Sequence, residues 1–150
     1  EFKNLQAFRA MEGKPIPTGD WGVGTQEMVD DFANATGDFQ WIHVDPEKAA
    51  NHSPFRRTVA HGFLSLALLS RLLGDAIRVR SATMGVNYGL NKVRFPSPVP
   101  VDSRIRLTGS VQELEDYGDN GLKITWHCAV EIEGSDKPAC VAEFISLMFE

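Results

Sequence analysis

Asp38 and His43 are the residues whose types and spacing are best suited to chemistry in this chain. A carboxylate can accept a proton, and an imidazole can hold or share one near neutral pH. Two such groups five positions apart in one irregular segment can therefore converge on a single water molecule. The apolar neighbours Phe39, Trp41 and Ile42 could lower the local polarity and raise the basicity of the carboxylate. The spacing also fits a structural interpretation, in which the Asp caps a turn and His43 bonds to backbone.

A second candidate element is Ala60-His61-Gly62, which stands at the start of an apolar helical segment. The first turn of a helix has unpaired backbone N–H groups and the positive end of the helix dipole. A glycine there lets a ligand approach the backbone closely. Such a place suits an oxygen that gains negative charge during reaction, as a thioester carbonyl does on forming an enolate. Close packing of helix against sheet at Gly62 is the structural alternative.

Other kinds of site lack their residue patterns. The histidines show neither the two-histidine helical spacing nor the cysteine pairing of a zinc site, so we expect no metal. His127 falls on the outward phase of a strand, and His52 lies in a loop. The chain contains no Gly-x-Ser-x-Gly nucleophile motif and no phosphate-binding glycine loop. Cys128 and Cys140 exclude a disulfide scaffold and favour two buried thiols, with one bridge at most.

The elements that must position Asp38 and His43 are short helices. Helical spacing begins after Thr25, a good N-cap, and ends at Gly37. Residues 38–44 are expected to form a loop. Asp45-Pro46-Glu47 then combines an N-cap, a proline at the first helical position and an acidic first turn, which predicts a short helix to about Ala50.

His61–Leu73 reads as one helix that is apolar nearly all round, with Gly74 as its C-terminal glycine. A helix without a polar face must be covered on most sides. We therefore expect this helix to lie at the centre of the core.

Beyond Ala76 the apolar period changes from about 3.6 to 2, which indicates antiparallel strands with one face on the core. The predicted strands are 84–95, 105–111, 122–132 and 139–149, and turn-rich residues 116–121 join the second and third as a hairpin. Helices come early and strands come late. The sequence therefore predicts an α+β class, with a long sheet curled round one buried helix in a single domain spanning 1–150.

Composition excludes several classes of protein. The chain has 15 Lys and Arg against 20 Asp and Glu, a net charge of −5, which argues against a nucleic-acid partner. Its apolar runs are too short to cross a membrane, and its first residues show no secretion signal, so we expect a cytoplasmic protein. Residues 56–106 hold nine basic and two acidic side chains. That segment could steer a small anionic ligand, or its charges could simply solvate strand faces and helix ends.

Taken together, Thr36-Gly37-Asp38-Phe39-Gln40-Trp41-Ile42-His43-Val44-Asp45-Pro46, then Phe55 and Ala60-His61-Gly62-Phe63, resemble the signature of the MaoC-like, (R)-specific enoyl-CoA hydratase family. Asn87-Tyr88-Gly89-Leu90-Asn91-Lys92-Val93-Arg94-Phe95 and the proline-rich turn after it resemble the subgroup of nodulation protein N-like proteins. The resemblance covers roughly Gln26 to the C-terminus.

This resemblance implies a hot-dog fold, usually a homodimer whose two sheets join edge to edge. It also implies syn addition of water to a trans-2-enoyl thioester, giving the (R)-3-hydroxyacyl product, and the reverse dehydration. Asp38 and His43 would hold and deprotonate the water, and the N–H of Gly62 would bind the thioester oxygen. His61 and Ser70 would be supporting residues, with Ser70 supporting the catalytic loop. Gln40 stands where many family members carry Asn, which puts one hydrogen bond of that loop in doubt.

Three functions follow as hypotheses. The first is an enoyl-CoA hydratase that needs no cofactor beyond the CoA of its acyl-CoA substrate. The second is a thioesterase of the same fold, in which Asp38 acts at the carbonyl. The third is a non-catalytic module that binds acyl thioesters. The intact pair of Asp38 and His43 counts against the third, whereas Gln40 leaves it open.

Overall fold

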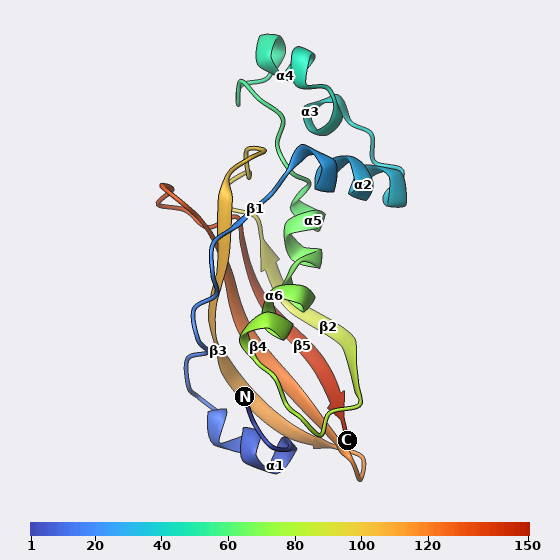
Figure 1. Ribbon diagram of the computed structural model, residues 1–150, viewed down its shortest axis with the longest axis vertical. Coiled ribbons are helices and arrows are strands. Elements are labelled where there is room, and N and C mark those ends of the chain that lie inside the picture. The colour runs from blue at the N-terminus through green and yellow to red at the C-terminus, as the bar shows by residue number, and fades with distance from the viewer.

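One antiparallel sheet of five strands dominates the computed structural model, which describes residues 1–150 (Figure 1). The strands are β1 (Gly22–Val23), β2 (Met84–Arg94), β3 (Arg104–Tyr117), β4 (Gly121–Ile132) and β5 (Cys140–Phe149), in the order β1-β3-β4-β5-β2. The hairpin of β3 and β4 is present, and β2, β4 and β5 lie within one residue of their predicted bounds, whereas β3 continues six residues beyond its predicted end at 111. The α+β class is confirmed, and so is the hot-dog arrangement, in which a curved sheet wraps around a central helix.

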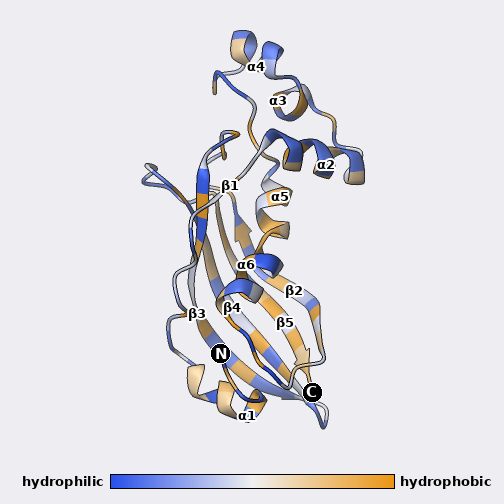
Figure 2. Cartoon of the chain, viewed as in Figure 1, coloured by the Kyte–Doolittle hydropathy of each residue, from blue (hydrophilic) through white to orange (hydrophobic).

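The core lies in the hollow of this sheet. Alternating side chains of β3 and β4 point inward, and Leu107, Val111, Leu122 and Ile124 are completely buried. Figure 2 shows the resulting bands of apolar and polar residues along β4 and β5. Such alternation is what a sheet with one face on the core requires.

One end of the hollow is closed by the N-terminal segment. Helix α1 (Leu5–Phe8) is followed by a single 3-10 turn, η1 (Arg9–Met11), and the fully buried Phe8 packs against Trp126 with ring centroids 5.9 Å apart. The two cysteines, Cys128 and Cys140, are free thiols in this core, and burial raises their pKa values to about 12 and about 11. The prediction of two buried thiols is confirmed.

The central helix differs from its prediction. It consists of α5 (Gly62–Ala67) and α6 (Leu69–Ala76), which meet at Leu68, and Gly74 lies inside α6 instead of ending it. The buried face holds Leu64, Leu69 and Leu73, but Phe63 is 69% exposed. The expected cover on most sides is therefore absent from this single chain, and an apolar face of the helices stays open.

Helices α2 (Gln26–Thr36), α3 (Trp41–Val44) and α4 (Pro46–His52) extend beyond one end of the sheet (Figure 1). Thr25 caps α2 by accepting a hydrogen bond from the Met28 N–H, and Gly37 ends it with φ +82°, both as predicted. Asp45 caps α4, also as predicted, although α4 continues to His52. The predicted loop 38–44 is half wrong, because its second part forms the single turn α3.

No helix in the structure is both long enough and apolar enough to cross a membrane.

Candidate active site

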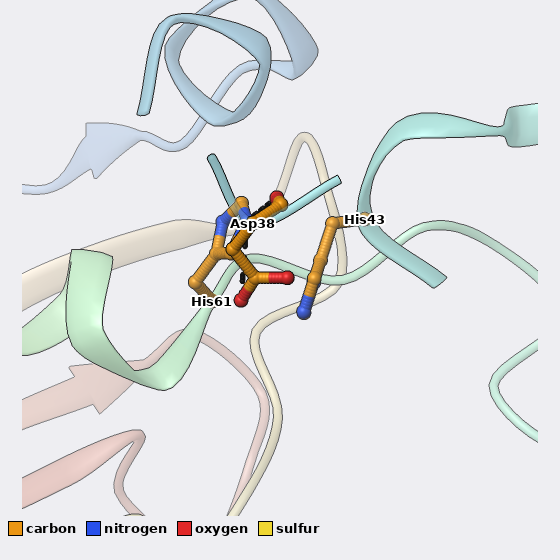
Figure 3. A group of neighbouring side chains, drawn as sticks. All are labelled: Asp38, His43 and His61. Atoms are coloured by element: carbon orange, nitrogen blue, oxygen red, sulfur yellow. Dashed lines mark hydrogen bonds and ion pairs between the residues drawn. The ribbon is translucent and has the colours of Figure 1, made fainter. Parts of the chain in front are cut away.

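Asp38, His43 and His61 come together at the junction of α2, α3 and α5 (Figure 3). One potential ligand atom from each of the three side chains lies within 4.8 Å of the other two. The three residues differ sharply in burial, since His43 and His61 are 7% and 3% exposed whereas the Asp38 side chain is 51% exposed. The site thus combines two buried imidazoles with a carboxylate that solvent and substrate can reach.

His43 is held as a neutral base. Its Nδ1–H donates to the carbonyl of Val59 at 2.6 Å, and because a carbonyl can only accept, Nδ1 carries the proton. The Nε2 lone pair is then free. Burial lowers the pKa of His43 below its ordinary value of 6.5; the Val59 hydrogen bond opposes this shift, and the nearby His61 adds to it.

Asp38 is placed by backbone contacts on both sides. Its N–H points to the Thr36 hydroxyl at 3.4 Å, its carbonyl accepts a hydrogen bond from Nε2 of His61 at 3.0 Å, and its Oδ1 accepts from the N–H of Gln40 at 3.3 Å. Gln40 therefore supports the loop through its backbone. Its side chain is exposed and makes no hydrogen bond within the chain, so the amide contributes no hydrogen bond to the loop.

His61 joins the pair from the helix side. Its ring stacks on His43 with centroids 3.9 Å apart and planes 24° apart, and Phe32 packs on it at 4.9 Å. Its Nδ1 is the one buried side-chain nitrogen or oxygen without a hydrogen-bond partner. A ligating imidazole binds an ion about 2.0–2.1 Å away in its own ring plane. Two stacked rings direct their lone pairs along nearly parallel planes, so this cluster is badly arranged to chelate a metal.

Gly62 begins α5, and its N–H has no acceptor within the protein. The ring of Phe95 lies against it, since a Cβ at Gly62 would stand 3.0–3.3 Å from three Phe95 ring carbons. Both sequence interpretations of Gly62 therefore correspond to a feature of the structure. The residue permits close packing, and it leaves a backbone donor unpaired beside the site.

Ser70 does not contact the loop of Asp38, which corrects the role expected for it. Its hydroxyl bonds to Oδ1 of Asn87 on β2 at 3.2 Å. The physical reason is the distance along the helix, because eight residues at 1.5 Å each carry Ser70 about 12 Å beyond Gly62.

An apolar groove of about 450 Å³ lies between the helices and β2, and Phe63, the residue after Gly62, is part of its lining. Phe63, Leu66, Leu69, Leu90 and Phe144 supply its apolar walls, and Ser70 and Asn87 contribute its polar part. A second groove of about 280 Å³ continues past Ser70 toward Ile77.

The basic segment is partly neutralised by neighbouring acids. Four of its nine cations are paired with carboxylates: Arg71, Arg80, Arg104 and Arg106. Arg57 donates to the Val101 carbonyl. These pairs support the interpretation in which the charges of residues 56–106 serve strand faces and helix ends, and they count against the steering of an anionic ligand.

Gln26 and Thr58 were missed by the sequence interpretation. Their side chains bond to each other at 2.6 Å, and Gln26 also donates to the His43 carbonyl at 2.8 Å. Gln26 is recognisable in the sequence only as a first-turn residue of α2, which carries no sign of a contact 17 or 32 positions away.

Comparison with known proteins identifies the family of the chain. The model of the MaoC-like domain family matches residues 7–127. The 3-hydroxyacyl-thioester dehydratase Z of Mycobacterium tuberculosis (strain ATCC 25618 / H37Rv) is 52% identical over 144 residues, covering 96% of this chain and 95% of that protein. Nodulation protein N of Rhizobium leguminosarum bv. viciae is 43% identical over 137 residues, covering 91% and 85%. The solved R-hydratase PhaJ1 from Pseudomonas aeruginosa has a TM-score of 0.70 at 21% identity, covering 92% of this chain and 81% of that one.

A curved sheet around a central helix gives the chain a hot-dog fold, and the family match together with the 52% identical dehydratase makes it a protein of the hydratase–dehydratase type. The chain belongs to the MaoC-like domain family, and it is an enzyme of that type. The family and the subgroup that the motifs resemble are both confirmed.

Proposed function

We propose that this enzyme catalyses the reversible addition of water to a trans-2-enoyl thioester, which gives the (R)-3-hydroxyacyl thioester. The observation that carries the proposal is the grouping of a buried His43, whose Nδ1 is taken by Val59, with the exposed carboxylate of Asp38, in a cluster whose potential ligand atoms lie within 4.8 Å of one another. Two similar proteins, a 3-hydroxyacyl-thioester dehydratase and an R-hydratase, support this substrate class.

In the direction of hydration, Asp38 and Nε2 of His43 accept hydrogen bonds from one water molecule. The water oxygen forms a bond to the β-carbon while one of its protons passes to the pair. The pair then returns a proton to the α-carbon, so that one water has been added across the double bond and the pair is regenerated. The N–H of Gly62 donates to the thioester oxygen as it gains enolate charge. Dehydration reverses each step.

The groove lined by Phe63 is assigned to the acyl chain, because Phe63 is the chain neighbour of Gly62 and the walls of the groove are mostly apolar. The thioester carrier in this proposal is CoA, which enters as part of the substrate, and the reaction needs no further cofactor. A cytoplasmic location stays a prediction.

A homodimer joined through β2 belongs to the same proposal. Strand β2 pairs only with β5, so its other edge is free. Four large apolar side chains of this strand are exposed: Met84, Val86, Tyr88 and Leu90. A long edge strand with exposed apolar residues is a template for pairing with another chain. A second copy would also cover the open side of α5 and α6 and narrow the groove.

One assay separates this function from its two alternatives. Purified protein is given crotonyl-CoA and longer trans-2-enoyl-CoAs, while loss of the conjugated double-bond absorbance and release of free thiol are followed together. Loss of the double bond without free thiol, with (R)-3-hydroxyacyl-CoA as product, supports the proposal. Free thiol would identify a thioesterase, and tight binding without either change would identify a binding module.

A further inference from the structure

Gln26 makes three hydrogen bonds with its one side-chain amide. Its Nε2 donates to the carbonyl of His43 at 2.8 Å and to Oδ1 of Asp30 at 2.9 Å. Its Oε1 accepts from the hydroxyl of Thr58 at 2.6 Å. Asp30 is an exposed neighbour one turn along α2, whereas the other two contacts connect α2 to the two segments that hold His43.

The second of these segments is the extended stretch that begins at Thr58. Thr58 is 3% exposed, and its carbonyl accepts from the N–H of Val101. The next residue, Val59, uses both of its backbone groups on α3, because its N–H donates to Ile42 and its carbonyl accepts from Nδ1 of His43. The position of Thr58 therefore sets the position of the carbonyl that selects the protonated nitrogen of His43.

These contacts form a closed circuit. It runs from the His43 carbonyl through Gln26 to Thr58, along one peptide unit to Val59, and back to the His43 ring. Within the circuit, the side-chain amide of Gln26 bonds directly to the His43 carbonyl. It reaches the His43 ring indirectly, through Thr58 and the carbonyl of Val59. Removing that amide would leave α3 and the 58–59 segment hydrogen-bonded to each other only through Val59, and would release both from α2.

We propose that Gln26 is a positioning residue, which acts with Thr58 to fix His43 in the Nδ1–H tautomer and so keeps Nε2 unprotonated and facing the water. The effect on turnover rests on the proposed hydratase function. The effect on the tautomer does not, because it follows from the hydrogen bonds alone. Neither side chain reaches the reacting atoms in this proposal.

The test uses two variants that remove the same bond from opposite ends, Gln26→Met and Thr58→Val, each close to the original in size. Thr58→Ser, which keeps the hydroxyl, serves as the rescue. Glu27→Met is the matched control, because Glu27 is the exposed neighbour of Gln26 on α2. The 15N chemical shifts of the His43 ring, assigned by comparison with His43→Gln, report its tautomer, and kinetics with crotonyl-CoA report turnover.

We expect the wild-type protein, Thr58→Ser and Glu27→Met to show His43 protonated at Nδ1. Gln26→Met and Thr58→Val should show a mixture of tautomers and a kcat lower by about 10–100-fold, with KM changed by no more than about twofold. The double variant should be no worse than the more damaged single variant, because both break one circuit.

An unchanged His43 tautomer in both variants would overturn the proposal, whatever happens to turnover. The proposal would also be overturned if Thr58→Ser lowered kcat as much as Thr58→Val does. If the wild-type protein hydrates no enoyl-CoA, the proposed function fails, and the ring spectra of the folded variants still decide whether Gln26 fixes the tautomer.

Discussion

Combining Asp38→Asn with His43→Gln tests whether the two side chains act on one water molecule. Loss of a general acid–base group costs about 10²–10⁴-fold in rate, or roughly 2.7–5.4 kcal/mol at 1.36 kcal/mol for each factor of ten. Two independent groups would multiply, so that the double variant would lose about 10⁴–10⁸-fold. Groups that share one water act as a unit, and the double variant should then lose about as much as the worse single variant.

The structure predicts that both single variants fold. Asn at position 38 keeps an Oδ1 that can accept from the Gln40 N–H, and the side chain there is half exposed. Gln at position 43 brings an amide N–H that can replace Nδ1–H toward Val59. It loses the ring stack on His61, worth about 0.5–1.5 kcal/mol. At about 2–4 °C for each kcal/mol, Tm should fall by only a few degrees.

The assay measures kcat/KM for hydration of crotonyl-CoA by the four proteins of this cycle, with Tm of each as the control for folding. Rate losses that multiply, in variants whose Tm stays within those few degrees, would refute the shared water. A single variant that keeps the wild-type rate would remove its residue from the mechanism altogether.

Three further predictions concern the surroundings of the pair. Gly62→Ala places a methyl group against Phe95, whose exposed ring can move aside, so Tm should hardly change. The methyl group obstructs the N–H at position 62, and kcat should therefore fall roughly 10–100-fold. An unchanged kcat would exclude this N–H as a donor to the substrate. Because burial lowers the pKa of His43, the imidazole stays neutral down to a pH below 6.5. The hydration rate should therefore still be level at pH 6.5 and decline only at lower pH, and a rate that already declines at pH 6.5 or above contradicts this. Val86→Lys puts a charge on the free edge of β2 and should raise the Kd of the dimer by at least about tenfold in sedimentation experiments; an unchanged dimer would place the interface elsewhere.

Local signals in the sequence were sufficient for the ends of α2 and the start of α4, but not for α3, which carries His43. Thr25, Gly37 and Asp45 act through bonds to residues within four positions, and so their effects on helix ends can be predicted from the sequence. The central helix was harder, because its break at Leu68 has neither Pro nor Gly to mark it. The break and the open face of the helices depend on how they pack in the sheet, which no local pattern records.

The sequence indicated some residues of the candidate site, but neither its geometry nor the contacts of Gln26 and Thr58. Asp38, His43 and Gly62 could be chosen from their types, spacing and resemblance to a family motif. The burial of His43, its protonated nitrogen and its stack on His61 arise from segments 16 to 18 positions apart. Ser70 shows the limit of position matching, because two helical turns carried it to a partner on β2.

The contrast in burial between Asp38 and His43 is what lets one short loop supply two different groups. Here α3 and the 58–59 segment enclose the imidazole, which keeps it neutral, while the carboxylate stays open to water. Neither segment belongs to the sheet, and Gln26 of α2 bonds to both. The geometry of the pair therefore depends on how α2 is seated, and changes in α2 should alter turnover while the sheet and its core remain unaffected.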